Sequence, residues 1–270
     1  MNYEDYYKLK AIKFIHEINV KKNTFKELIS SIGYPLENIK VLDIGFGSGE
    51  ILFCFNQTNE LNGVDLSYNA VKRSVKRAKK EGYKHFKFLR LDISKSKMLP
   101  FSPRYFDIII CSHVIEHVNN DVSILQEIKR LIKPNGKIVI GIPINEKLDN
   151  PKYYRKYNTD SFVQKLKKLG LETKSIIENN SINRFFDIIS KTEGIPALRY
   201  ALSVILNVAF SITPWSVLSK LDRQLIKKGV LPEQAFLVVE KIDKKQNHLN
   251  QTKIHFRDNF FNKGGEGLLK

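Results

Sequence analysis

Short apolar runs alternate with amphipathic segments along most of the chain. Seven apolar runs favour buried strands. The first ends at Asp43, and the others lie at 63–67, 86–91, 107–112, 137–143, 171–177 and 235–241. Segments with apolar residues at helical spacing lie between them, at 51–55, 69–82, 121–131 and 159–169. Because strands and helices alternate, the pattern predicts an α/β fold.

The residues before the first strand also have apolar positions at helical spacing. These positions are Tyr7, Ile12, Phe14, Ile15, Ile18, Phe25, Leu28 and Ile29, and they predict two helices within 3–33. We expect these helices to form an N-terminal cap over residues 1–38. Simple packing on the edge of the sheet would explain the same pattern.

A glycine-rich turn follows the first strand, in the run DIGFGSGE at 43–50. The alternate glycines Gly45, Gly47 and Gly49 permit positive φ, so the turn can bend sharply and bring backbone N–H groups against a ligand. The second strand ends in Asp65, about twenty residues after the turn, where a carboxylate can accept both ribose hydroxyls of a nucleotide. The pattern therefore predicts a nucleotide-type site.

The charges around the turn distinguish between ligands. The dinucleotide fingerprint is G-x-G-x-x-G, whereas the glycines here are spaced G-x-G-x-G and are followed directly by Glu50. An acid at this position would repel a pyrophosphate, and Asp43 at the strand end suits a cationic amino group. A ligand with adenosine at one end and an amino acid at the other fits these charges better than NAD does.

Several motifs in register resemble those of a known family. They are DIGFGSG at 43–49, GVD at 63–65, LDI at 91–93, LPF at 99–101, FDIIICSHVIEHV at 106–118 and LIKPNGK at 131–137. Through them the chain resembles the class I S-adenosylmethionine-dependent methyltransferases over residues 38–178, and within that class the ubiquinone-biosynthesis type. The resemblance implies a Rossmann-like, doubly wound sheet of seven strands, mostly parallel with the last strand antiparallel. It also implies that the leading helices cover the cofactor.

The resemblance implies that S-adenosyl-L-methionine is the cofactor. The residues that it places around the cofactor are Asp43, Gly45, Phe46, Gly47, Gly49, Asp65, Leu66, Asp92, Ile93 and Ser112. Asp92 would accept the adenine amine, and Ile93 would offer its backbone N–H. A cap on a helix or turn is the alternative role for Asp92, because Asp commonly serves there.

Three ionisable residues follow the fourth strand and reach the carboxyl end of the sheet, where doubly wound folds bind ligands. A histidine titrates in the range needed to take a proton from an acceptor hydroxyl, so His117 and His113 are the candidate bases and Glu116 the group that orients them. A structural polar role beside the cofactor is the alternative for each. The run also matches the letters H-x-x-E-H of a zinc signature, but it leaves a strand and crosses a turn, so we expect no metal.

The chain is strongly basic, with 45 Lys and Arg against 28 Asp and Glu and a formal net charge of +17. Such a charge fits nucleic acid, an anionic membrane surface or an acidic substrate, and it also fits a composition bias, since Lys greatly outnumbers Arg. The helix at 69–82 has a basic face formed by Lys72, Arg73, Lys76, Arg77, Lys79 and Lys80. An RNA-methylating role is the alternative that this face supports, although no aromatic residues interleave with its charges to stack bases.

The cysteines and the first residues indicate the compartment. Cys54 and Cys111 form no C-x-x-C pair, so the sequence predicts neither a disulfide framework nor a zinc cluster. The start, MNYEDY, is acidic and aromatic, unlike a secretory signal. We expect a cytoplasmic protein, with peripheral contact at the membrane as an addition.

The last two strands are separated by an unusually long helical insertion, at 179–234. It includes 200–219, which carries no charge and is long enough to span a membrane. A single crossing is excluded because both flanking strands must join one sheet. The insertion is either a lid over the acceptor pocket or a monotopic membrane contact through Leu206, Phe210 and Trp215. Either role predicts an acceptor that is partly hydrophobic.

The sequence thus predicts a methyltransferase core at 39–178, a final core strand at 235–243 and a basic tail at 244–270. A loop with Tyr153, Tyr154, Arg155 and Tyr157 would contact the acceptor or pack as a structural loop. The expected activity is in-line methyl transfer to a small, partly hydrophobic acceptor such as a lipid, a quinone precursor or a glycolipid. The alternatives are an RNA methyltransferase and a non-catalytic accessory protein that binds S-adenosylmethionine or associates with a membrane.

Overall fold

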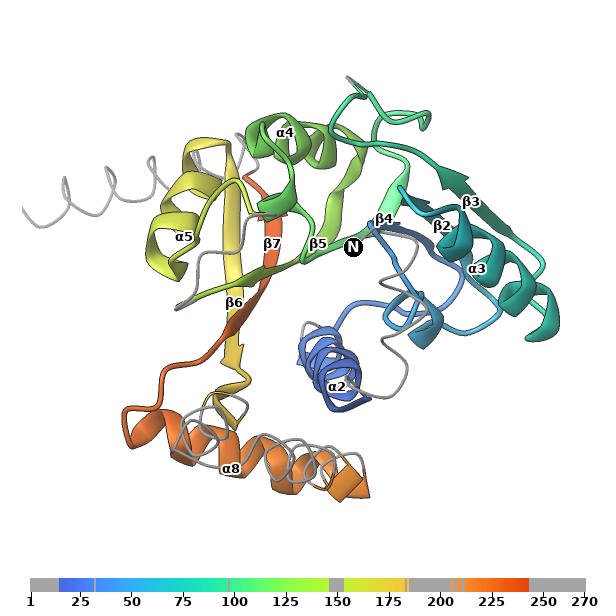
Figure 1. Ribbon diagram of the computed structural model, residues 1–270. Coiled ribbons are helices and arrows are strands. Elements are labelled where there is room, and N and C mark those ends of the chain that lie inside the picture. The colour runs from blue at the N-terminus through green and yellow to red at the C-terminus, as the bar shows by residue number, and fades with distance from the viewer. Residues whose placement is uncertain are drawn as a thin grey trace, which may run out of the picture.

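The described part of the protein is a single sheet with helices on both faces (Figure 1). The computed structural model describes residues 15–31, 33–96, 98–145, 153–182, 184, 205, 208–209 and 212–242. The predicted tail, most of 185–211 and the first predicted helix before residue 15 lie outside the described residues.

The sheet has seven strands, in the spatial order β3-β2-β1-β4-β5-β7-β6. The strands are β1 (Lys40–Ile44), β2 (Glu60–Asp65), β3 (Phe86–Arg90), β4 (Phe106–Ser112), β5 (Ile132–Pro143), β6 (Leu171–Asn179) and β7 (Gln234–Lys241). Strands β1 to β5 pair in parallel, and β7 runs antiparallel to both of its neighbours. The predicted α/β, doubly wound sheet with an antiparallel last strand is confirmed.

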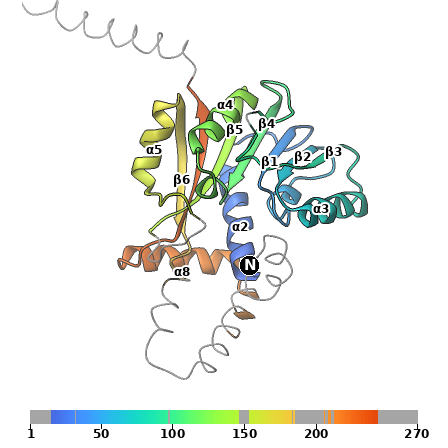
Figure 2. The ribbon, with the colours of Figure 1, turned by 45° about the horizontal axis from the view of Figure 1, so that its top comes forward.

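Two apolar layers cover the sheet. One face packs against α4 (Asp121–Leu131) and α5 (Thr159–Lys168), and the other packs against α2 (Ile15–Ser31), the 3₁₀ turn η1 (Leu52–Cys54) and α3 (Tyr68–Lys80). The views in Figures 1 and 2 show the two helical layers on opposite sides of the strands. Because both faces are covered, the central strands are buried along most of their length, as their continuous apolar runs predict.

Helix α8 (Trp215–Lys227) lies across the end of β6 rather than on a face of the sheet (Figure 2). The buried carboxylate of Asp222 accepts the backbone N–H groups of Asn180 and Ile182, both at 3.0 Å, directly after β6. The indole N–H of Trp215 also donates to Glu27 of α2 at 3.2 Å. Since β6 runs parallel to β5 through β7, this end of β6 is on the same edge of the sheet as the glycine turn.

The predicted helix after the glycine turn is wrong. Only the single 3₁₀ turn η1 forms, and Phe55 is already extended, with φ −81° and ψ 148°. The reason is the short distance to β2 and the buried Asn59, whose side chain accepts the N–H of Ile39 at 3.0 Å and donates to the carbonyl of Leu36 at 2.9 Å. This side chain anchors the connection before a longer helix could return to the sheet.

One other expectation differs in detail from the structure. The residues 133–136, expected as a turn, belong to β5, because the ladder with β4 continues past them through a register shift between Phe106 and Ile108. Of the two helices expected within 3–33, the structure describes one, α2, and the other lies outside the described residues.

Candidate functional site

The glycine turn after β1 adopts the conformation that its spacing predicts. The φ angles are +71° at Gly45, +55° at Gly47 and +75° at Gly49. A Cβ on Gly45 would lie only 2.3 Å from Cγ2 of Val114, so the turn packs directly against the loop after β4. The absence of a side chain at this position lets the two loops meet at the carboxyl edge of the sheet.

Asp65, at the end of β2, is buried and faces this turn. One of its carboxylate oxygens accepts the N–H of Gly47 at 2.8 Å, and the other accepts the N–H of Ser67 at 2.8 Å. A carboxylate oxygen can accept more than one hydrogen bond, so these contacts are compatible with the predicted role toward the ribose hydroxyls. The carboxylate also fixes the turn that would hold the ligand.

Asp43, at the other side of the turn, is also buried. Burial raises the pKa of Asp43 well above its usual range, and the negative charge of Asp65 raises it further. A cationic group placed beside these two carboxylates would offset both effects. The pair is therefore suited to a ligand that carries an amino group, as the sequence predicts.

Phe46 and Leu66 occupy opposite environments. The ring of Phe46 is buried against Phe88, and a Cβ on Gly63 would lie 2.5 Å from its Cδ1. Phe46 thus contributes its backbone to the turn while its side chain belongs to the core. Leu66, directly after Asp65, leaves 42% of its surface exposed, so an apolar surface is available beside the predicted ribose site.

Asp92 caps a turn after β3. Its Oδ1 accepts the backbone N–H of Ser94 at 3.0 Å and the hydroxyl of Ser94 at 2.5 Å. These hydrogen bonds, together with Lys95, hold the pKa of Asp92 below its usual value. The structural alternative for Asp92 is therefore realised, and its contact with adenine stays a prediction. Ile93 is half-buried and packs against the core.

The chain turns sharply after β4, at His113. This residue has a φ of +54°, and its backbone N–H donates to the carbonyl of Gly141 at 2.9 Å. The imidazole Nε2 lies 3.1 Å from Oε1 of Gln234, and Nδ1 lies 3.6 Å from Oε1 of Glu116. Burial lowers the pKa of His113, and Lys21 lowers it further, while Glu116 and Gln234 act in the opposite direction. The preceding residue, Ser112, has a buried hydroxyl without a hydrogen-bond partner in the described part of the chain.

Glu116 and His117 lie on the 3₁₀ turn η2 (Ile115–His117). The side chain of Glu116 is fully buried, and among the described residues neither of its oxygens has a hydrogen-bond partner. The ring of His117 is half-buried and packs edge-on against Tyr153, with 4.9 Å between centroids. The structure therefore brings Glu116 together with His113, whereas His117 faces the loop after β5.

The family model for a methyltransferase domain matches residues 35–192, which is more than half of the chain. The chain belongs to this family. The motifs and the seven-stranded sheet place it among the class I S-adenosylmethionine-dependent methyltransferases, so the protein is a methyltransferase and S-adenosyl-L-methionine is its cofactor.

Two relatives of this methyltransferase match it at similar sequence identity but over different shares of the two chains. An uncharacterised protein of Methanocaldococcus jannaschii is 29% identical over 205 residues, which are 72% of this chain and 91% of that protein. The ubiquinone biosynthesis O-methyltransferase of Leptothrix cholodnii is 27% identical over 142 residues, or 52% of this chain and 56% of that enzyme. The chain thus spans about half the length of that enzyme.

A solved structure shares the fold at low sequence identity. The 1,6-didemethyltoxoflavin-N1-methyltransferase of Burkholderia thailandensis, with bound 1,6-didemethyltoxoflavin and S-adenosylhomocysteine, has a TM-score of 0.53 and 15% identity. The match covers 88% of this chain and 82% of that chain. At this identity the likeness concerns the fold alone.

The loop after β5 holds the post-β4 loop of the methyltransferase in place. The guanidinium of Arg155 donates to the carbonyls of Ile115 at 3.1 Å, Val118 at 2.7 Å and Asn119. Tyr157 is buried and donates to Asp121 at 2.7 Å. The predicted aromatic loop therefore has structural contacts at Arg155 and Tyr157, and its Tyr153 lies beside His117.

Sequence reasoning missed Gln234, the first residue of β7, which contacts His113. The sequence carries only a weak signal for it, a polar residue at the start of an apolar strand. It also missed the role of Arg155 as a clamp, since nothing in the local pattern shows that a loop residue binds carbonyls about forty residues earlier.

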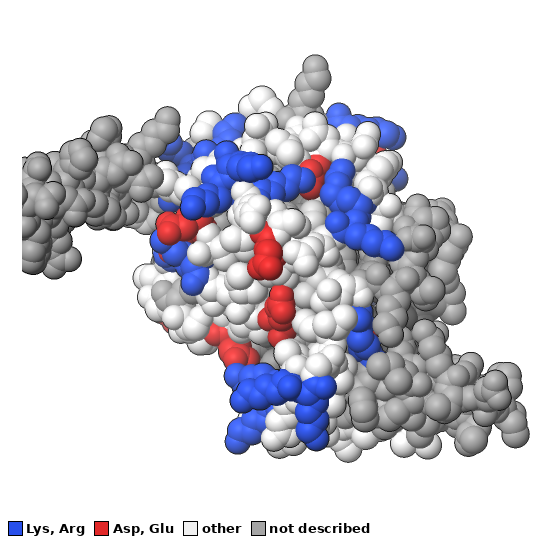
Figure 3. Space-filling view, turned by 90° about the vertical axis from the view of Figure 1, so that its left-hand side faces the viewer, with Lys and Arg blue, Asp and Glu red and all other residues white. Residues whose placement is uncertain are grey.

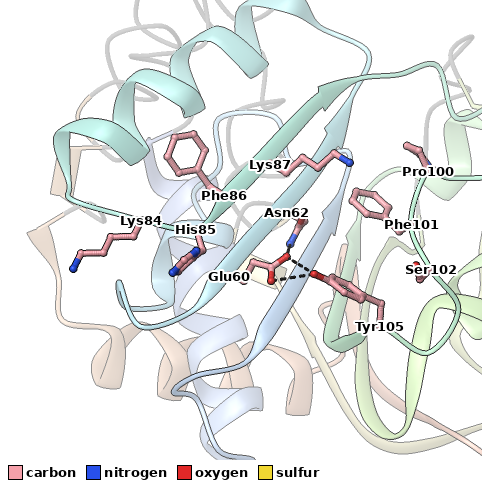
Figure 4. Close-up of a pocket in the computed structure, with 10 residues that line it drawn as sticks. All are labelled: Glu60, Asn62, Lys84, His85, Phe86, Lys87, Pro100, Phe101, Ser102 and Tyr105. Atoms are coloured by element: carbon pink, nitrogen blue, oxygen red, sulfur yellow. Dashed lines mark hydrogen bonds between the residues drawn. The ribbon is translucent and has the colours of Figure 1, made fainter.

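A cavity lies elsewhere, at the amino-terminal ends of β2 and β3 (Figure 4). It has a volume of about 440 Å³, and the hydroxyl of Tyr105 donates to the carboxylate of Glu60 in its wall at 3.0 Å. Asn62 donates to the same carboxylate at 3.0 Å. This cavity is at the opposite edge of the sheet from the glycine turn, so it is distinct from the predicted cofactor site.

The basic face predicted on α3 is exposed, apart from Arg77, which forms an ion pair with Glu81 at 2.7 Å. On another side of the molecule, Figure 3 shows basic side chains at the upper and lower margins with acidic ones between them. The positive charge is thus spread over several surfaces.

Within the described residues, no group of three or more His, Cys, Asp or Glu side chains is arranged to hold a metal ion.

Proposed function

We propose that this methyltransferase acts on a small, partly hydrophobic acceptor such as a lipid, a quinone precursor or a glycolipid. The observation that carries the proposal is the meeting of two loops at one edge of the sheet. The glycine turn with Asp65 lies on one side, and the loop with His113, Glu116 and His117 lies on the other, joined where Gly45 packs against Val114.

The residues around the glycine turn would hold the cofactor. Asp65 would accept the ribose hydroxyls, Asp43 would face the amino group, and the backbone of Gly45 to Gly49 would lie against the ligand. Leu66, Asp92 and Ile93 would surround the adenine. The support is the burial of both carboxylates, the positive φ angles of the glycines and the exposed side chain of Leu66.

The residues after β4 would handle the acceptor. The cofactor supplies a methyl group already activated on a sulfonium, so the protein has to align an acceptor atom and, for a hydroxyl, remove its proton. His113 is suited to that task, since the lowered pKa keeps its imidazole neutral near pH 7. His117 is the second candidate, and Glu116 would orient His113 and stabilise its charge after proton transfer.

A partly apolar acceptor is supported by two observations. The matched relatives include a ubiquinone biosynthesis O-methyltransferase and, at 26% identity over 108 residues, the demethylmenaquinone methyltransferase of Lactococcus lactis. In addition, the helical insertion exposes apolar side chains, with Ile212 at 78%, Val217 at 53% and Leu221 at 39%.

We also propose that α8 lets the protein rest on an anionic membrane from which it takes such an acceptor. The exposed residues of this region include Lys220, Arg223, Lys227 and Lys228 beside the apolar ones. Figure 3 shows basic side chains clustered at the lower end of the molecule, where α8 ends. No helix in the described part of the chain is long and apolar enough to cross a membrane, so the contact would be peripheral.

Calorimetric titration with S-adenosylhomocysteine, followed by an acceptor screen that begins with quinols and lipid phenols, tests the proposal. Wild type should bind at micromolar Kd, Asp65→Ala should bind at least about tenfold more weakly, and the exposed Asp160→Ala should bind like wild type. Methyl transfer to an apolar phenol that is lost in His113→Asn would support the assigned base. Transfer only to RNA, or none with an intact cofactor site, would contradict the acceptor class.

A further inference from the structure

A chain of buried polar side chains connects His113 to the N-terminal helix. Nε2 of His113 lies 3.1 Å from Oε1 of Gln234. Nε2 of Gln234 donates to Oδ1 of Asn179 at 2.8 Å, and Nδ2 of Asn179 donates to Oγ1 of Thr24 at 2.5 Å. Gln234, Asn179 and Thr24 are all buried. They come from the start of β7, the end of β6 and the middle of α2, so three separate elements contribute to the chain.

The direction of these hydrogen bonds decides which nitrogen of His113 holds the proton. With the amide of Gln234 in this orientation its oxygen accepts, so Nε2 of His113 donates to it and carries the proton. Gln234 presents its oxygen because its amide nitrogen is engaged by Asn179. In the neutral imidazole, Nδ1 is then unprotonated and faces Glu116.

Among the described residues, the side chain of Glu116 has no hydrogen-bond partner, and the imidazole of His113 lies beside it. The Glu116 side chain is fully buried, and Oε1 lies 3.6 Å from Nδ1 of His113. A buried polar group without a donor is costly, and an imidazole that takes up a proton at Nδ1 would place a donor on the side of Glu116. Lys21 from α2 is the other charged group that acts on His113.

We propose that Gln234 is a positioning residue that holds His113 as the Nε2–H tautomer, so that the unprotonated Nδ1 is the nitrogen that faces Glu116. Asn179 and Thr24 hold the Gln234 amide in the required orientation. Helix α2 thereby acts on the candidate base His113 through three side chains. The catalytic use of His113 rests on the proposed function, whereas the tautomer does not.

The hydrogen bonds from His113 to Thr24 have one competing arrangement. If both amides were reversed, Gln234 would donate to Nε2, and Nδ1 would carry the proton and donate to Glu116. The hydroxyl of Thr24 can donate or accept, so it allows either direction. The two arrangements differ in the tautomer of His113, which nitrogen NMR reads directly.

The test is imidazole nitrogen NMR on the full-length protein labelled with ¹⁵N-histidine, with His113 assigned by its loss in His113→Asn. Wild type should show a single neutral tautomer protonated at Nε2. Gln234→Met should show a mixture of both tautomers. Asn179→Leu should also show a mixture, although it retains Gln234, because the amide of Gln234 is then no longer held in one orientation. The exposed Gln164→Met makes the same chemical change as Gln234→Met elsewhere and should leave the His113 signals unchanged.

Gln234→Glu keeps an acceptor at the same place and covers the case in which Gln234→Met fails to fold. It should retain the Nε2–H tautomer and move the titration of His113 upward by about one pH unit or more, because a carboxylate stabilises the imidazolium. An Nδ1–H tautomer in wild type, an unchanged single tautomer in Gln234→Met, or an unshifted titration in Gln234→Glu would overturn the proposal. None of these readings requires methyl transfer, so they stand apart from the test of the acceptor.

Discussion

The carboxylate of Asp65 accepts the backbone N–H of Gly47 at 2.8 Å, joining the end of β2 to the glycine turn after β1. Its second oxygen accepts the N–H of Ser67 at the same distance, which orders the start of α3. One side chain thus holds both segments between which the nucleoside of the cofactor is expected. A change at Asp65 should therefore affect both the conformation of the glycine turn and the binding of the cofactor.

Asp65→Asn should weaken S-adenosylhomocysteine binding although the side chain keeps its size. The amide nitrogen would face one of the two backbone N–H groups and leave it without an acceptor, at a cost of about 1–3 kcal/mol. That corresponds to a loss of about tenfold or more in affinity, measured by calorimetry. Equal affinity in Asp65→Asn and wild type would show that the turn does not depend on this carboxylate.

Gly45→Ala should disrupt the site more than an ordinary glycine substitution. The added Cβ would meet Cγ2 of Val114 at 2.3 Å, and φ is +71°, so steric and backbone strain add. Gly82→Ala is the matched control, since its φ is +78° but nothing lies within 4 Å of the added Cβ.

Urea denaturation should show a loss of about 1–2 kcal/mol for Gly82→Ala and a further 1–3 kcal/mol for Gly45→Ala. Adding Val114→Ala to Gly45→Ala should restore part of the loss by removing the opposing methyl groups. If Gly45→Ala cost no more than Gly82→Ala, the close packing of the two loops would be refuted.

Asp43→Asn should stabilise the protein without ligand and weaken cofactor binding. Burial and Asp65 raise the pKa of Asp43 above 3.8, so the folded state retains a proton that the unfolded state has already released. The free energy of unfolding therefore falls as pH rises from about 3.8 through the raised pKa. The variant lacks this term, so its advantage should grow over that window and persist at neutral pH.

Thermal unfolding at several pH values, with and without S-adenosylmethionine, measures both effects of Asp43→Asn. We expect a higher Tm for the free variant at pH 7 and a smaller rise in Tm on adding the ligand. A Tm difference between variant and wild type that stays constant from pH 4 to neutral would contradict the assigned cause.

The membrane contact predicts a specific sensitivity in α8. Replacing Val217 and Leu221 by Glu should reduce flotation with vesicles that contain anionic lipid by about tenfold or more, because two exposed apolar side chains are lost and two charges are added. Ser216→Glu with Gln224→Glu adds the same charge at exposed polar positions and should reduce flotation less. Equal flotation of the two double variants would place the contact elsewhere.

The sequence by itself determined the strands, most of the helices and the glycine turn. Apolar periodicity reports burial over a few neighbouring residues, and alternate glycines at 45, 47 and 49 report backbone that must reach positive φ. Both are local properties, so they identify the α/β fold and the cofactor class. They failed at residues 51–55, where only one 3₁₀ turn forms and Asn59 anchors the following connection through contacts with another segment.

Only the tertiary structure decided how the site after β4 is supported. Thr24 and Asn179 are 155 residues apart in sequence and share a hydrogen bond, and Gln234 reaches His113 across 121 residues. The side chain of Phe46 likewise joins the core because Gly63 of the next strand leaves room for it. A polar residue at a strand end has no local preference for one distant partner, so these contacts exist only once the sheet has brought its strands together.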